Sequence, residues 1–124
     1  NLEKITHLEP IDKIEKLYAA ADFFILPSIY EPFGNANLEA LASGLPIITS
    51  RFCGAAEIIT HNKEGIILEE PSDFNSIAKA IDYLMDSKTR KLMSHSARIL
   101  AEKFTQERNA SSMLKIYQDL VENR

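Results

Sequence analysis

Residues 27–40 read Pro-Ser-Ile-Tyr-Glu-Pro-Phe-Gly-Asn-Ala-Asn-Leu-Glu-Ala, and they combine two carboxylates with a glycine at an expected helix start. Glu31 precedes this helix and Glu39 lies a little over one turn inside it. Gly34 lets the backbone approach a ligand closely, and the free N–H groups of residues 35–37 would turn the positive helix end toward an anion. Because carboxylates also accept hydrogen bonds from paired sugar hydroxyls, the layout favours a ligand with both phosphate and polyol, such as a nucleotide sugar.

A simpler explanation competes with that interpretation. Acidic residues are common near helix starts, where they complement the helix dipole. On the local pattern alone, a structural role for Glu31 and Glu39 has about the same weight as a ligand role.

The segments around this stretch alternate between strand and helix patterns. Short apolar runs, typical of parallel strands covered on both faces, occupy residues 23–26, 47–49 and 66–68. Helix patterns between them cover residues 35–42 and 54–60. Right-handed crossovers then give a parallel sheet, so the fold class is α/β of the Rossmann-like type with flanking helices. Ligands of such sheets bind at the carboxyl ends of strands, which points to the loops after Leu26 and Thr49.

Both ends of the chain extend this core pattern. Residues 4–8 read as a short strand, and apolar residues at helical spacing follow Pro10 as far as Ala21. Gly44 is expected to close helix 35–42 in a left-handed conformation. Beyond Pro71 the pattern is helical: Ser72 or Asp73 caps a helix to about Met85, and two more helices cover residues 89–104 and 106–123. We expect a single domain over residues 1–124 with a helical C-terminal tail.

Composition excludes several partners. The chain has 124 residues, and its 14 basic and 18 acidic residues give a net charge of −4, which disfavours binding to nucleic acid. No apolar stretch is long enough to span a bilayer, and the opening Asn-Leu-Glu-Lys lacks the layout of a signal peptide. We therefore expect a cytoplasmic protein, and peripheral contact with the inner face of the membrane stays open.

Other reactive residue types lack the neighbours that their chemistry needs. The single cysteine, Cys53, excludes an internal disulfide and is read as a small structural residue. Ser28 and Ser43 lack the Gly-x-Ser-x-Gly pattern of hydrolases. Arg51 is read as a solvated loop residue, whereas the role of Glu57 stays open. No metal site is expected, because metal-ligand spacing is absent around His7, His61 and His95.

Several motifs together resemble the C-terminal part of retaining GT-B glycosyltransferases of glycosyltransferase family 4. Residues 21–28 resemble the family's strand with its Pro-Ser exit. Residues 31–47 resemble its signature, in which Glu-Pro-Phe-Gly is followed by Glu-Ala and then by Ala-x-Gly-x-Pro, with seven residues between the two Glu. The resemblance continues over residues 54–59, 64–68 and 104–108, and so covers nearly the whole chain.

The resemblance implies a role for each residue of the loop. Glu31, as the catalytic residue, would contact the hydroxyls of the donor sugar, and Glu39 would hold the nucleotide ribose. The sugar phosphate would be lined, chiefly through backbone, by Phe33, Gly34, Asn35 and Ala36. The implied reaction transfers a sugar from a nucleotide-diphosphate sugar to a glycan or lipid-linked acceptor with retention of configuration. Neither a metal nor another cofactor is required, because the leaving diphosphate assists the reaction and its electrostatic stabilisation dominates.

The resemblance also implies parts that are missing here. The family's C-terminal domain begins with a strand, a helix and a strand that supply an Arg and a Lys for the diphosphate, and an N-terminal domain binds the acceptor. We therefore expect a partial donor-binding domain that is inactive in isolation. Residues 4–8 would lack their normal partners, and an exposed sheet edge would favour self-association. Two alternatives stay open: a non-catalytic module that binds a nucleotide or sugar phosphate, and a structural fragment that binds nothing.

Overall fold

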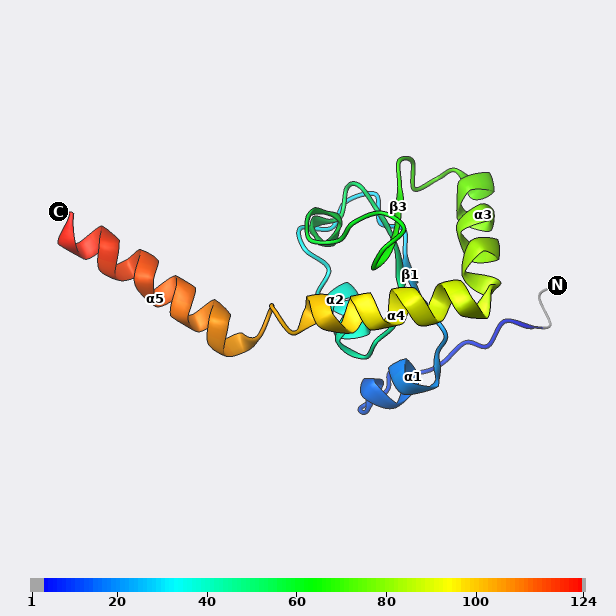
Figure 1. The fold of residues 1–124 in the computed structure, drawn as a ribbon, viewed down its shortest axis with the longest axis horizontal. Helices are drawn as coiled ribbons and strands as arrows, with labels where there is room; N and C mark the ends of the chain where they lie inside the picture. The colour runs from blue at the N-terminus through cyan, green and yellow to red at the C-terminus, as the bar shows by residue number, and fades with distance from the viewer. Residues whose placement is uncertain (1–3, 124) are drawn as a thin grey trace.

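The computed structural model describes residues 4–123, which form a three-stranded parallel sheet with helices on both faces (Figure 1). The strands are β1 (Phe24–Leu26), β2 (Ile47–Ser50) and β3 (Gly65–Leu68), in the order β1-β2-β3. Every residue of the central strand β2 is buried, as expected for a strand with a neighbour on each side. The predicted α/β class and the three central strands are therefore confirmed.

Side chains that alternate along the strands enter two apolar cores on opposite faces of the sheet. Helices α1 (Ile14–Ala20) and α2 (Asn35–Ala42) cover one face, α3 (Phe74–Met85) covers the other, and α4 (Ser87–Ala101) contributes to both. The first core includes Tyr18, Leu41, Ile47, Ala97 and Ala101. The second includes Ile48, Ile66, Leu68, Leu84 and Met93. Since each buried Leu or Ile side chain contributes about 1.5–3 kcal/mol, these cores hold α2 firmly against the sheet.

Local signals place the helix ends. Helix α2 follows Gly34, and the turn after it places Gly44 at φ 77°, so the predicted left-handed glycine is confirmed. Asp73 caps α3, and Asp86 caps α4 by accepting a hydrogen bond from the Thr89 N–H at 2.7 Å. The predicted helix over residues 54–60 is shorter, because only the 3-10 helix η2 (Gly54–Glu57) forms.

The predicted strand over residues 4–8 is wrong. Residues 5–11 hold no helix or strand, and residues 4–16 are exposed. A strand is stabilised by backbone hydrogen bonds to a neighbour, and no strand within residues 4–123 pairs with this segment. Helix α1 also begins late, at Ile14, after a Lys13 that offers no side-chain cap.

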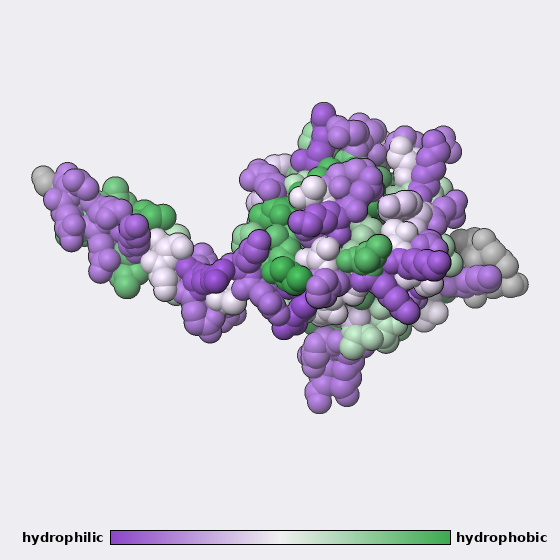
Figure 2. All heavy atoms as spheres, viewed as in Figure 1, coloured by the Kyte–Doolittle hydropathy of each residue, from purple (hydrophilic) through white to green (hydrophobic). Residues whose placement is uncertain are grey.

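Helix α5 (Gln106–Glu122) is predicted correctly as a helix but extends away from the rest of the molecule (Figure 1). None of its residues is buried. Figure 2 shows apolar side chains along this helix among polar ones. Its exposed large apolar residues are Met113, Leu114, Ile116, Tyr117, Leu120 and Val121. Within the described part of the chain, no helix is both long enough and apolar enough to cross a membrane.

Candidate functional site

The two loops that the sequence points to, which leave the carboxyl ends of β1 and β2, contact each other. The Glu31 N–H donates to the Phe52 carbonyl at 3.2 Å, and the Gly54 N–H donates to the Glu31 carbonyl at 3.0 Å. The Ala55 N–H then donates to the Phe33 carbonyl at 2.9 Å. Three backbone hydrogen bonds thus fasten the loop that carries Glu31 to the turn that leads into η2.

Two glycines make this close contact possible. A Cβ at Gly54 would lie 2.1 Å from the Pro32 carbonyl oxygen and 2.9 Å from the Phe33 Cα, which no side chain could tolerate without moving the loop. Gly34 has φ 76°, a left-handed conformation that favours glycine, and a Cβ there would lie 2.8 Å from Nδ2 of Asn37. The path of the loop therefore depends on glycine at both positions.

A buried amide lies beneath the loop. The Asn37 side chain is fully buried, and its Nδ2 donates to Sγ of Cys53 at 3.2 Å and to Oγ1 of Thr49 at 3.5 Å. The Cys53 thiol donates in turn to the Phe33 carbonyl at 3.3 Å, and the Thr49 hydroxyl donates to the Leu26 carbonyl at 3.4 Å. Asn37 Oδ1 has no hydrogen-bond partner among the described residues. This network ties the loop to the carboxyl ends of both β1 and β2.

The sequence patterns did not predict this network. Cys53 is a structural residue, as predicted, but its thiol acts as a hydrogen-bond donor and acceptor rather than only as a small apolar group. Asn37 entered the prediction only for its backbone N–H. No local signal singled out Asn37, because Asn35 and Glu39 of the same short helix are polar as well and are exposed.

The start of α2 offers fewer free donors than predicted. The Asn37 N–H donates to the Gly34 carbonyl at 2.8 Å, so the expectation that it is free is wrong, because the first helical turn already uses it. The N–H groups of Asn35 and Ala36 make no hydrogen bond to another residue within the range 4–123. Two backbone donors therefore remain for an anion, beside a loop that carries Glu31.

The two carboxylates lie in different surroundings. Glu31 is partly buried where the two loops meet, whereas Glu39 is exposed on α2. Oε2 of Glu39 accepts a hydrogen bond from the Tyr18 hydroxyl at 3.1 Å. Burial raises the pKa of Tyr18, and the hydrogen bond to Glu39 raises it further, so the phenol remains a donor at neutral pH. The sequence patterns gave Tyr18 no role beyond its place among the apolar residues at helical spacing between Pro10 and Ala21.

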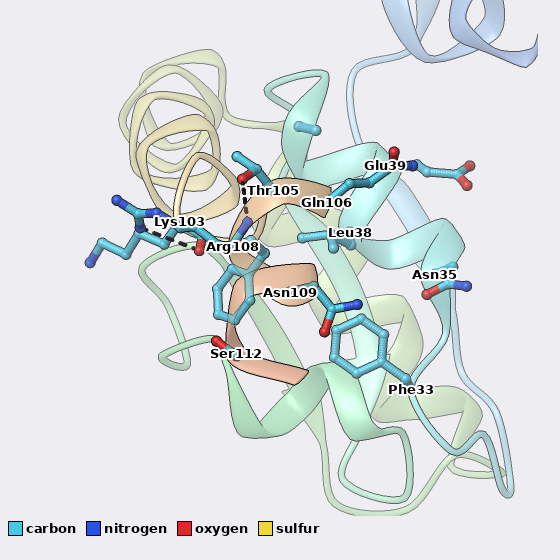
Figure 3. A pocket seen from close by; sticks show the side chains of 12 residues that line it. Phe33, Asn35, Leu38, Glu39, Lys103, Thr105, Gln106, Arg108, Asn109 and Ser112 are labelled. Carbon is cyan, nitrogen blue, oxygen red and sulfur yellow. Dashed lines mark hydrogen bonds between the residues drawn. The ribbon is translucent and has the colours of Figure 1, made fainter. Parts of the chain in front are cut away.

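A groove of about 910 Å³ lies between α2 and the start of α5 (Figure 3). Three of the predicted site residues line it, namely Phe33, Asn35 and Glu39, whereas Glu31, Gly34 and Ala36 do not. The opposite wall comes from residues 103–106, Arg108, Asn109 and Ser112. In Figure 3 the two cationic side chains of that wall, Lys103 and Arg108, point away from Glu39. The groove therefore brings one carboxylate together with aromatic and amide groups.

Other titratable residues lie outside this arrangement. Arg51 forms an exposed ion pair with Glu69 at 3.3 Å, in agreement with its reading as a solvated loop residue. His61 accepts a hydrogen bond from the Ile67 N–H at 3.1 Å through Nδ1. Over residues 4–123, no group of three or more His, Cys, Asp or Glu side chains could hold a metal ion. That the chemistry needs no metal stays a prediction.

Comparison with known proteins adds a family to this geometry. Residues 1–100 match the protein-family model described as Glycosyl transferases group 1. An uncharacterised glycosyltransferase of Methanocaldococcus jannaschii is 35% identical over 113 residues, which are 90% of this chain and 29% of that protein.

Two solved structures are similar over most of the chain. Sucrose-phosphate synthase from Thermosynechococcus elongatus superimposes with a TM-score of 0.89 and 29% identity, covering 98% of this chain and 31% of that one. The HepE protein of Anabaena, solved in complex with UDP-glucose, gives a TM-score of 0.66 and 26% identity, covering 71% of this chain and 24% of that one. The chain thus spans less than a third of the length of each of these relatives.

Proposed function

Because this chain belongs to the Glycosyl transferases group 1 family, we propose that its Glu31 loop and the start of α2 bind the nucleotide-diphosphate sugar donor of a sugar transfer. One observation carries the proposal. The backbone clamp between residues 31–33 and 52–55 fixes the Glu31 loop just before a helix start with two N–H groups that have no partner among residues 4–123, at the carboxyl edge of a parallel sheet. That edge is where open α/β sheets bind their ligands. The solved complex of the Anabaena relative with UDP-glucose supports the same ligand class.

Each group has a distinct part in this proposal. The N–H groups of Asn35 and Ala36 donate to the diphosphate, and Gly34 lets it approach the backbone closely. Phe33 packs beside the sugar phosphate. Glu39 accepts hydrogen bonds from the ribose hydroxyls, and Glu31 accepts hydrogen bonds from hydroxyls of the donor sugar.

The proposed reaction retains the configuration at the anomeric carbon. The bond between that carbon and the diphosphate oxygen breaks while the acceptor hydroxyl attacks from the same face, through a transition state with oxocarbenium character. The acceptor proton passes to the leaving diphosphate. The helix N–H groups stabilise the charge that develops on the leaving group, which is the larger part of the catalysis available to this chain's own residues.

The acceptor is proposed to be a glycan or a lipid-linked saccharide, bound by regions beyond the third of the relatives' length that this chain spans. We place the reaction in the cytoplasm. Cations for the diphosphate are proposed to come from those same regions of the relatives' length. This chain by itself is therefore expected to bind a donor weakly and to transfer no sugar.

Two substitutions test the division of roles. Glu31→Gln should weaken binding of the nucleotide sugar and leave binding of the nucleoside diphosphate unchanged, because it touches only the sugar. Glu39→Ala should weaken binding of both by about 1–3 kcal/mol, as expected for the loss of a charged hydrogen-bond acceptor. Calorimetric titration of the two variants measures both effects. Equal losses for Glu31→Gln with the two ligands would contradict the assignment of the sugar to that residue.

A further inference from the structure

Helix α1 buries one side chain, and Leu17 beside it is half-buried. Tyr18 is the only buried residue in α1, with 7% of its surface exposed. Its ring packs edge-on against Phe24 at a centroid distance of 5.9 Å. Its hydroxyl then crosses to α2, where it lies 3.1 Å from Oε2 of Glu39 and 3.5 Å from the Ala36 carbonyl oxygen. The buried ring therefore holds the phenol hydroxyl against Glu39, which is the predicted site carboxylate that lines the groove.

The contact changes what Glu39 can do. An exposed glutamate on a helix surface moves among several rotamers and loses that freedom when it binds a ligand. A hydrogen bond from a buried phenol reduces this loss, because the carboxylate is already held in one orientation. The phenol uses one acceptor position of Oε2 of Glu39, and Oε1 makes no hydrogen bond with any residue in the range 4–123. A fixed carboxylate with one free oxygen suits a ligand that presents two adjacent hydroxyls.

We propose that Tyr18 is a positioning residue that holds Glu39 ready for the vicinal hydroxyls of the nucleotide ribose. The inference rests on the proposed donor-binding function and adds a residue from outside the loop and α2. It also gives the site a means of selection: a nucleotide without the 2′ and 3′ hydroxyls gains nothing from an oriented Glu39.

Binding of two matched ligands tests the proposal. UDP and 2′,3′-dideoxy-UDP are titrated into the unmodified chain, Tyr18→Phe and Tyr83→Phe by calorimetry. Tyr18→Phe keeps the ring and removes only the hydroxyl, so it should weaken UDP binding about three- to tenfold and leave the dideoxy ligand unaffected. Tyr83 is 47% exposed on α3 and makes no contact with Glu39, so Tyr83→Phe should change neither affinity. In a Glu39→Ala background, Tyr18→Phe should have no further effect on UDP.

The outcomes separate the two proposals. Equal weakening of both ligands by Tyr18→Phe would show a merely structural role and overturn the positioning role alone. Absence of binding of UDP, GDP and ADP alike by the unmodified chain would contradict the donor site itself, and the positioning role with it. If GDP or ADP binds in place of UDP, the same comparison is made with that nucleotide and its 2′,3′-dideoxy form.

The contact itself has a test that needs no ligand and no change at Tyr18. An alkaline NMR titration should show a lower pKa for Tyr18 in Glu39→Gln than in the unmodified chain, because the neutral amide no longer opposes ionisation of the phenol. An unchanged pKa of Tyr18 would overturn the positioning role.

Discussion

Helices α4 and α5 follow one another in the chain and have equally amphipathic patterns, yet only α4 packs against the rest of the protein. Met93, Ala97 and Ala101 of α4 are buried against α2, α3 and the sheet, whereas α5 buries nothing. Sequence periodicity therefore predicts an apolar helix face but not the surface that covers it. The two walls of the candidate groove differ in the same way, because one lies on the packed helix α2 and the other on the start of the exposed helix α5.

The largest effect is expected from a substitution that disrupts the clamp, which is the set of backbone hydrogen bonds between residues 31–33 and 52–55. Gly54→Val would drive side-chain atoms into the Pro32 carbonyl, because a Cβ at position 54 would lie 2.1 Å from its oxygen, so the Glu31 loop must move. We expect destabilisation by more than about 3 kcal/mol and loss of nucleotide binding. Chemical denaturation and calorimetric titration measure the two effects.

Gly44→Ala is the matched control for that substitution. Gly44 is also left-handed, at φ 77°, but its Cβ would meet only Ser94, at 3.4 Å or more and remote from the loop. It should cost about 1–2 kcal/mol of stability while nucleotide affinity is retained. If Gly54→Val bound nucleotide normally, the clamp would not be what shapes the site.

The core beneath α2 gives the next largest effect. Leu41 is fully buried between α2 and the sheet, so Leu41→Ala should lower the free energy of unfolding by about 2–5 kcal/mol. Urea denaturation followed by circular dichroism gives the value. A loss below about 1 kcal/mol would show that α2 is held less firmly than its burial indicates.

Some features of these elements could be predicted from the sequence alone, and others could not. The strand pattern over residues 47–49 and the glycine at position 44 are local signals, and both predictions are confirmed, by β2 and by the left-handed Gly44. Residues 4–8 have strand-like composition, but a strand needs a neighbour, and the composition of one segment carries no information about its neighbours. The contacts of Asn37 and Tyr18 join residues far apart in the chain, so no local pattern could reveal them.

A smaller effect concerns the cap of α4. The pKa of Asp86 is lowered, chiefly by the backbone N–H of Thr89 and then by the Thr89 side chain. Its stabilising contribution is therefore present above the pKa of an unfolded aspartate and is lost as pH falls through the lower folded value. Asp86→Asn should flatten this acid limb of the stability curve, measured by denaturation between about pH 2 and 5. An acid limb identical to that of the unmodified chain would contradict the capping role.

The smallest effect is expected on the free helix. Leu120 is 64% exposed on α5, so Leu120→Ala should change the stability of this chain by less than about 0.5 kcal/mol. Thermal denaturation alongside Leu41→Ala makes the comparison direct. A loss of about 2 kcal/mol would mean that α5 packs on an apolar surface in solution and would remove the contrast between the two helices.

The central claim is that the Glu31 loop and the start of α2 form a donor site, and an NMR titration tests it most directly. The chain is titrated with UDP, GDP, ADP and their sugar conjugates while the amide signals of residues 34–39 are followed. We expect saturable shifts at Asn35 and Ala36 with one nucleotide, because their two N–H groups have no partner in the described part of the chain. Absence of shifts with every nucleotide, or shifts confined to α5, would contradict it.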